Sequence, residues 1–207
     1  DILGEVDAGG DTTIQSSSIS GGVEAGGDTD IDGDSTIRGS VIGEGGVDIE
    51  QNVTVEGDID NTASGDGDVA IGGSTVSGNV TAAGDLSVSS GSQIGGDVST
   101  DNEFDVSNVE IGGQIDAGSD VTVQSSTVGG IDSDAQLDLS GSTVDGTAIA
   151  NGESSIESTT VSGDVVINGD LDLEDSTVQG HAFVGGDFSC DSSTINGQSC
   201  SAYTSPD

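Results

Sequence analysis

The chain has 207 residues but no lysine, and Arg38 is its only strongly basic residue. It carries 39 aspartates and glutamates, so its formal net charge is −38. Binding to nucleic acid requires lysine and arginine to neutralise the phosphates. We therefore expect no nucleic-acid partner, and anionic membranes and acidic polysaccharides are disfavoured for the same reason.

Aromatic residues are scarce as well, with three Phe, one Tyr and no Trp. Paired carboxylates can hydrolyse glycosidic bonds, but the β-helical enzymes that do so have larger coils, long loops and aromatic platforms for the sugar. Acyltransferases built on hexapeptide coils need a catalytic histidine and a six-residue repeat, and the repeat of this chain does not fit. We expect a protein that is not an enzyme, with no catalytic residues and no cofactor.

Long apolar runs and proline are also missing. No segment approaches the ~20 apolar residues of a membrane-spanning helix, so we expect no membrane insertion. The single proline is Pro206, close to the C-terminus. Because proline cannot donate to a β ladder, its near absence suits a chain whose backbone groups are mostly paired.

The chain is rich in glycine instead, and a glycine opens a repeat of about 17 residues along its whole length. One copy is GQIDAGSDVTVQSSTV from Gly113, and another is GDVVINGDLDLEDSTVQ from Gly163. A short fixed period of this kind is typical of a solenoid. We place these glycines at corners between strands, where a positive φ angle costs glycine little.

Apolar residues occupy fixed places in each repeat. In the repeat from Gly163 they are Val165 and Ile167, Leu171 and Leu173, and then Val178. Spacing by two indicates strands with one buried face, and three short strands separated by Gly, Asp, Ser and Asn predict a triangular coil. We therefore predict an all-β fold in which residues 1–196 form one β-solenoid of about 11 full coils. The extra residues 61–67 are predicted to form a surface loop.

The acidity is typical of proteins from extreme halophiles, because molar salt shortens the screening length to ~3 Å. A surface loaded with divalent ions in a less salty medium is the alternative. The chain begins at Asp1 rather than methionine, so we expect that a signal peptide was removed, although a shortened chain would begin in the same way.

Both cysteines, Cys190 and Cys200, lie near the C-terminus. We predict that they form a disulfide that pins the tail, residues 197–207, as a cap, which implies an oxidising compartment. The lone His181 is interpreted as a surface corner residue. Two triplets, at Asn52 and Asn79, match the N-glycosylation pattern and weakly support an extracellular setting.

The ends of a stacked β rod expose unpaired strand edges, and no capping helix is recognisable at either one. An open end can be closed by an identical subunit, which builds a filament when the contact repeats head to tail. The residues that we expect to make this polymer contact are Ile2, Leu3 and Tyr203.

An acidic residue precedes the middle strand in most repeats. Stacked ~4.8 Å apart, these carboxylates repel one another, and Ca²⁺ or Na⁺ between them would relieve the repulsion. The predicted cation ladder consists of Asp11, Asp28, Asp68, Asp85, Asp120, Asp170 and Asp187, and Glu103 and Glu153 share the column. A solvated turn column is the simpler interpretation.

A second column is rich in hydroxyl groups and precedes the last apolar position of the repeat. Ladders of hydroxyl groups commonly stabilise stacked strands, and threonine arrays on β-solenoids can also bind ice, which we disfavour here. The column includes Ser126-Thr127, Ser142-Thr143, Ser176-Thr177 and Ser193-Thr194.

In phrases such as GNVTAAGDLSV from Gly78 and GDVVINGDLDL from Gly163, the chain resembles the bactofilins, polymer-forming cytoskeletal proteins. The resemblance covers residues 4–196 and implies a right-handed β-helix that polymerises end to end without nucleotide. The chain departs from the family in its acidity, its paired cysteines and its lack of the short tails that contain proline and lysine. We therefore expect a structural subunit of an extracellular or surface filament in a halophilic archaeon. A cytoplasmic bactofilin-like scaffold and a monomeric surface or adhesin stalk are the alternatives.

Overall fold

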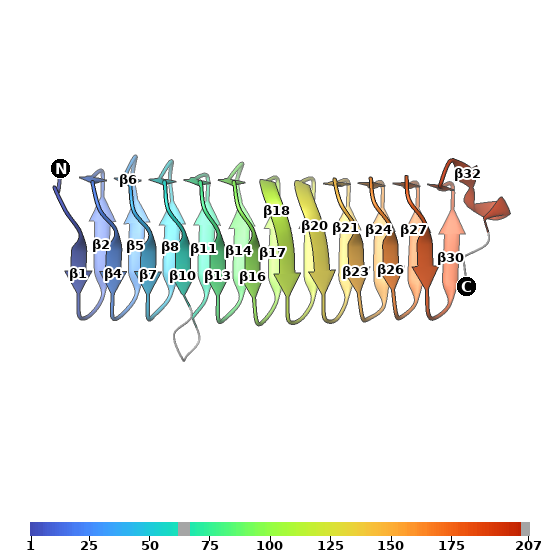
Figure 1. Cartoon of the computed structure of the whole chain (residues 1–207), viewed down its shortest axis with the longest axis horizontal. Coiled ribbons are helices and arrows are strands. Elements are labelled where there is room, and N and C mark those ends of the chain that lie inside the picture. Colours follow the sequence, from blue (N-terminus) through green and yellow to red (C-terminus); the bar gives the residue numbers. More distant parts are fainter. Residues whose placement is uncertain (62–66, 204–207) are drawn as a thin grey trace.

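A computed structural model describes residues 1–61 and 67–203. It is a straight rod in which the coils follow one another in sequence order from the N-terminus to the C-terminus (Figure 1). Each coil contributes three short strands, and each strand pairs in parallel with the matching strand of the next coil. The predicted parallel β-solenoid is therefore confirmed, with 11 coils counted on the sheet of middle strands.

Three faces run along the rod. The first face consists of β1 (Val6–Ala8), β4 (Val23–Ala25), β7 (Val41–Gly43), β10 (Ile59–Asn61), β13 (Val80–Ala82), β16 (Val98–Thr100), β18 (Glu110–Ala117), β20 (Thr127–Ser133), β23 (Ala148–Ala150), β26 (Val165–Ile167) and β29 (Ala182–Val184). The second face consists of β2 (Thr12–Gln15), β5 (Thr29–Asp32), β8 (Val47–Glu50), β11 (Val69–Gly72), β14 (Leu86–Ser89), β17 (Phe104–Ser107), β19 (Val121–Gln124), β21 (Leu137–Ser140), β24 (Ser154–Glu157), β27 (Leu171–Glu174) and β30 (Phe188–Asp191).

The third face has the shortest strands. It consists of β3 (Ser18–Ile19), β6 (Thr36–Ile37), β9 (Thr54–Val55), β12 (Thr75–Val76), β15 (Gln93–Ile94), β22 (Thr143–Val144), β25 (Thr160–Val161), β28 (Thr177–Val178) and β31 (Thr194–Ile195), together with the first residues of β18 and β20. Those two long strands turn the corner without a break, so they belong to the third face of one coil and the first face of the next. The last elements of the described part are β32 (Gln198–Ser199) and a short 3₁₀ helix, η1 (Cys200–Ala202).

The core is one continuous column of aliphatic side chains. All five apolar positions predicted for the repeat from Gly163 are at most 1% exposed. Phe104 is the largest fully buried side chain. Because a coil of this size buries little alone, stacking supplies most of the apolar burial.

The glycines that open the repeats have a different role from the one predicted. Most of them have no positive φ; instead, a Cβ atom on Gly163 would lie 2.6 Å from the carbonyl oxygen of Gly146 in the preceding coil. Gly146 has the same relation to Gly129, at 2.5 Å. Glycine is needed here because two backbones stack closely. The prediction that these glycines adopt a positive φ angle is wrong for this corner.

Positive φ angles occur at another corner, directly before the third face. There the residues are mostly Ser, Asp and Asn, for example Ser125 at 51° and Asp175 at 48°. Short polar side chains tolerate this left-handed conformation better than most. The predicted loop of residues 61–67 cannot be compared, because residues 62–66 lie outside the described part of the chain.

Candidate functional site: the two ends of the rod

The N-terminal end leaves strand edges without a neighbour. Among the residues that the structure describes, β1 pairs only with β4, and β2 pairs only with β5. The side of each strand that faces away from the second coil is therefore an open edge. Unpaired edges of this kind are templates for pairing with another chain.

The third face is partly closed at the same end. Ile2 forms a parallel bridge with Ile19, in which its amide donates to the carbonyl oxygen of Ser18 at 2.8 Å. The Ile2 side chain is still 44% exposed, and that of Leu3 is 94% exposed. Both predicted contact residues thus lie at the open end and are available to a partner.

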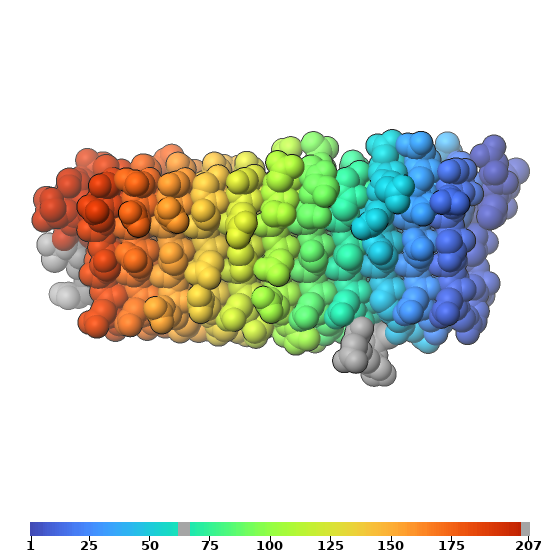
Figure 2. Space-filling view, turned by 180° about the vertical axis from the view of Figure 1, so that it is seen from behind, coloured from blue at the N-terminus to red at the C-terminus, as the bar shows by residue number. Residues whose placement is uncertain are grey.

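The C-terminal end is finished by the chain's own tail, which forms an extra layer beyond the last coil (Figures 1 and 2). β32 folds back and pairs antiparallel with β31. The amide of Cys200 donates to the carbonyl oxygen of Ser193 at 3.0 Å. These contacts cover the edge of the third face.

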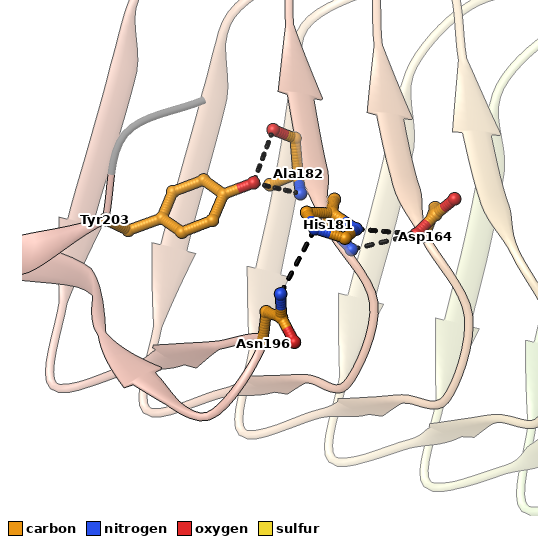
Figure 3. Close-up of polar contacts among 5 residues, drawn as sticks. All are labelled: Asp164, His181, Ala182, Asn196 and Tyr203. Atoms are coloured by element: carbon orange, nitrogen blue, oxygen red, sulfur yellow. Dashed lines mark hydrogen bonds and ion pairs between the residues drawn. The ribbon is translucent and has the colours of Figure 1, made fainter. Parts of the chain in front are cut away.

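Tyr203 covers the edge of the first face. Its hydroxyl oxygen accepts the Ala182 amide at 2.9 Å, and the hydroxyl donates to the Ala182 carbonyl oxygen at 3.2 Å (Figure 3). The predicted polymer-contact residue is thus engaged within its own chain, as part of the cap. Its role in a contact with another subunit stays a prediction.

The predicted disulfide is present. Cys190 in β30 and Cys200 in η1 are joined, with their Cα atoms 6.1 Å apart, and no cysteine is free. Cys190, Cys200 and Tyr203 all pack against the apolar core as half-buried residues. The disulfide therefore ties the cap to the second face, the one face that the hydrogen bonds of the tail do not reach.

His181 bridges neighbouring turns beside the cap. Its backbone amide donates to Oδ1 of Asp164 at 2.8 Å, and its Nε2 lies 3.1 Å from Nδ2 of Asn196 (Figure 3). Nδ1 lies 3.8 Å from the same Asp164 oxygen, and the two side chains are each 46% exposed. The position agrees with a surface corner residue.

The column of the predicted cation ladder has a structural role that the sequence did not reveal. Oδ1 of each of five members accepts a backbone amide from the next coil. The pairs are Asp11 with Asp28 at 3.2 Å, Asp28 with Gly46 at 2.9 Å, Asp68 with Asp85 at 2.9 Å, Asp120 with Gln136 at 3.0 Å and Asp170 with Asp187 at 2.7 Å. The carboxylates thus satisfy backbone donors at the corner between the first and second faces.

Cation binding by this column stays a prediction. In residues 1–61 and 67–203, no three His, Cys, Asp or Glu side chains come together as a set that could hold a metal ion. Crowding does affect Glu103, whose pKa is raised by the charge of Asp105, by partial burial, and by Asp85 and Asp120.

A second polar ladder, missed in the sequence, follows the opening glycines. Oδ1 of Asp58 accepts the Asn79 amide at 2.7 Å, and Oδ1 of Asn79 accepts the Asp97 amide at 2.9 Å. The same pattern joins Asp97 to Gln114 at 2.9 Å. This ladder could have been recognised in the sequence, because Asp or Asn recurs one residue after the glycine, as in Gly57-Asp58 and Gly78-Asn79.

The hydroxyl column is confirmed as a stacking element. Ser126, Ser142, Ser176 and Ser193 are each at most 5% exposed. Their hydroxyls donate to a carbonyl within the same coil and accept an amide from the preceding coil; for Ser142 these distances are 2.9 Å and 3.2 Å. The threonines that follow them belong to the third-face strands.

Asn52 and Asn79 are both exposed, as a glycosylation site requires. Nδ2 of Asn52 donates to Oδ1 of Asp34 at 2.7 Å, whereas Asn79 takes part in the ladder above through its Oδ1. Glycosylation of either residue stays a prediction.

None of the described helices is long and apolar enough to cross a membrane. Comparison of the chain with protein-family models, with curated proteins and with solved structures finds no match. What the structure supports of the resemblance to the bactofilins is the β-solenoid architecture, and membership of that family stays a prediction.

Proposed function

We propose that the protein is a structural subunit that self-assembles end to end, with the N-terminal end of one rod stacked on the C-terminal end of the next. The observation that supports this most is the open edge of β1 and β2. The first and last coils have the same three-strand plan, so a joint between subunits repeats the contact that joins coils within the rod. A repeated head-to-tail contact generates a filament.

The chemistry of the joint is edge-strand pairing together with burial of the exposed end. The amides of Thr12, the first residue of β2, and of Ser16, directly after β2, donate to the second coil. Because amide directions alternate along a strand, the amide of Thr13 faces away from the rod. Val6 and Ala8 are half-buried, whereas the matching Val23 and Ala25 in the next coil are at most 1% exposed. A neighbouring subunit would complete both the ladder and the core.

The setting that we propose is the outside or surface of a halophilic archaeal cell. Disulfides persist in oxidising compartments, and the single disulfide of this chain supports that location. The charge of −38 favours a salty medium, where screening reduces repulsion between neighbouring rods. A cytoplasmic scaffold of the bactofilin type is the alternative, and it is less compatible with the disulfide.

The cap supports a second candidate function, a monomeric surface or adhesin stalk. A rod whose C-terminal edge is covered by its own tail has no need of a neighbour at that end. The two candidates differ in their assembly state, since a stalk stays a single rod at every concentration.

Electron microscopy of the purified chain in ~3 M salt tests the proposal, with the disulfide intact and after its reduction by a dithiol, and each sample is examined again after dialysis to low salt. We expect filaments of stacked rods at high salt in the reduced sample. Thr13→Pro removes an amide that faces the open edge and leaves the strand's own bonds in place, so it should abolish assembly. Thr13→Val keeps the amide and is the matched control. Single rods in both the oxidised and the reduced sample, at all salt concentrations, would favour the stalk.

A further inference from the structure

We infer that residues 197–203 are a latch that closes the C-terminal stacking surface to a second copy of this chain, and that the Cys190–Cys200 disulfide locks it. The inference rests on the proposed end-to-end assembly and adds its regulation. It is carried by three contacts in which the latch replaces the groups of a missing twelfth coil.

The first contact lies on the first face. Within the rod, the amide of Val165 donates to the next coil, to the carbonyl oxygen of His181 at 2.8 Å. Ala182 is the matching residue of the last coil, paired with Val165 in the ladder. Its amide instead donates to the Tyr203 hydroxyl at 2.9 Å (Figure 3). The phenol oxygen therefore stands where the carbonyl oxygen of the next coil would lie.

The second contact lies on the third face. Within the rod, the carbonyl oxygen of Ser176 accepts the amide of Thr194 from the next coil at 2.9 Å. The matching carbonyl oxygen, on Ser193, accepts the amide of Cys200 at 3.0 Å. β32 lies along β31 in the antiparallel direction, whereas every other neighbour on this face is parallel. The latch thus pairs this edge in a direction that no further coil can continue.

The third contact is the disulfide itself. Cys190 occupies the inward position of β30 that Leu173 holds in the preceding coil, and Leu173 is fully buried. The bond to Cys200 carries the tail across this position. Phe188, which pairs with the buried Leu171, is 36% exposed, so the core at the start of β30 remains uncovered at the end of the rod. A stacking surface therefore exists beneath the latch.

Reduction opens the latch by thiol–disulfide exchange with a dithiol. One thiolate of the dithiol attacks a cystine sulfur and forms a mixed disulfide, and its second thiolate then displaces the protein sulfur. Cys190 and Cys200 each end as a thiol, having gained two electrons and two protons between them, and the dithiol becomes a disulfide. The tail is then held only by its hydrogen bonds and by packing of the Tyr203 ring against the core, and an incoming coil can replace both.

The latched chain therefore acts as a terminator of filament growth. A latched chain can add its open N-terminal end to the C-terminal end of a growing filament, but the first and third faces of its own C-terminal end are closed to the next subunit. An unlatched chain presents both surfaces and allows growth. Oxidation of the free C-terminal end therefore stops a filament, so in the oxidising setting proposed above growth takes place only through subunits whose disulfide has not yet formed.

The test compares the full chain in its oxidised form, in its dithiol-reduced form, and as the unlatched variant Cys200→Ser/Tyr203→Phe, by electron microscopy and sedimentation in high salt. We expect filaments from the two unlatched samples and only single rods or short assemblies from the oxidised chain. Adding oxidised chain to the unlatched variant should shorten the filaments in inverse proportion to its fraction. Oxidised chain that carries Thr13→Pro cannot join a filament and should have no such effect.

Two outcomes separate this inference from the proposed function. Equal filament lengths from oxidised and unlatched chains would overturn the latch and leave the end-to-end proposal intact. Single rods in every sample would overturn the proposed function, and the latch with it. Amide exchange gives a readout that does not depend on assembly: reduction should accelerate exchange at Ala182 and at Cys200, and an unchanged rate at both would contradict the latch directly.

Discussion

The two ends of the rod can be compared residue by residue, because the first and last coils share one plan. Val6 and Ala182 hold the same coil position, yet Val6 is half-buried at the N-terminal end whereas Ala182 is fully buried at the other. Ile19 and Ile195 also match, and both are fully buried, under Ile2 and β32 respectively. A short added segment therefore suffices to cover one face, but only the C-terminal end covers two faces and adds a covalent bond. The difference shows that a strand edge stays available to a partner where no segment of the described chain takes the place of a neighbouring coil.

The largest effect is expected from truncating the matched isoleucines. Ile195→Ala removes a fully buried side chain from a coil that the disulfide holds in place, so the cavity remains and the free energy of unfolding should fall by about 2–5 kcal/mol. Ile19→Ala should cost less, because the untied first coil can fray instead. Chemical denaturation of the two variants measures the difference. Equal losses would show that the two end coils are held equally well.

Removal of the disulfide should have the next largest effect. The bond closes a sequence separation of 10 residues, and loops of this size contribute roughly 3 kcal/mol by restricting the unfolded chain. We expect Cys200→Ser to lower the stability of the last coil by about that amount. Hydrogen exchange should accelerate in β29 and β31 and stay unchanged in β1 and β3. Uniform acceleration along the rod would mean that the ends do not behave independently.

The Tyr203 hydroxyl should contribute less. Tyr203→Phe keeps the ring against the core and removes both hydrogen bonds to Ala182. Typical net values for such bonds predict a loss of about 1 kcal/mol. The measurement is the exchange rate of the Ala182 amide. Tyr203→Leu, which also removes the ring, should raise that rate further, and a smaller change in that variant would contradict the assignment of the ring to the cap.

The smallest effect is expected from a charged residue in the body of the rod, away from both ends. Burial, Glu50 and Asp30 raise the pKa of Asp48 above its ordinary value of 3.8. Because the folded state then binds the proton more tightly than the unfolded state, this carboxylate lowers stability at neutral pH. The loss disappears as the pH falls through the raised pKa towards 3.8.

Asp48→Asn should therefore raise the melting temperature slightly at pH 7 and low salt. The gain should shrink in molar salt, which screens the charges of Glu50 and Asp30 but does not relieve burial, and it should vanish at low pH. Asp172→Asn is the matched control, since Asp172 holds the same place on the second face but pairs with Ser155 and Ser189. A larger gain at Asp172 than at Asp48 would show that neighbouring charges do not explain the effect.

Much of the rod was predictable from periodicity. The alternation in Val165, Ile167, Leu171 and Leu173 predicted two strands and their buried faces, and the structure confirms both. The spacing of Cys190 and Cys200 beside the last repeat likewise predicted their disulfide. These features are local or repeat at a fixed interval, so they can be recognised in the sequence alone.

The role of the opening glycines and of the acidic column was not predictable in the same way. A positive φ and a close backbone contact both favour glycine, and only the stacked coils show that Gly163 lies against Gly146. In the same way, only the folded rod shows that aspartates such as Asp170 accept a backbone amide of the next coil, while cation binding by the same column stays a prediction. Sequence composition does not distinguish an acid that binds an ion from one that accepts an amide.

The sequence by itself determined the coil, its period, its buried positions and the covalent link at one end, because each of these depends on residues that are close together or regularly repeated. Only the tertiary structure decided how the ends are finished. Tyr203 meets Ala182 across 21 residues, and β32 reverses direction on β31, because the fold brings the tail against the last coil. Among residues 1–61 and 67–203, no comparable segment lies on the open side of β1 and β2.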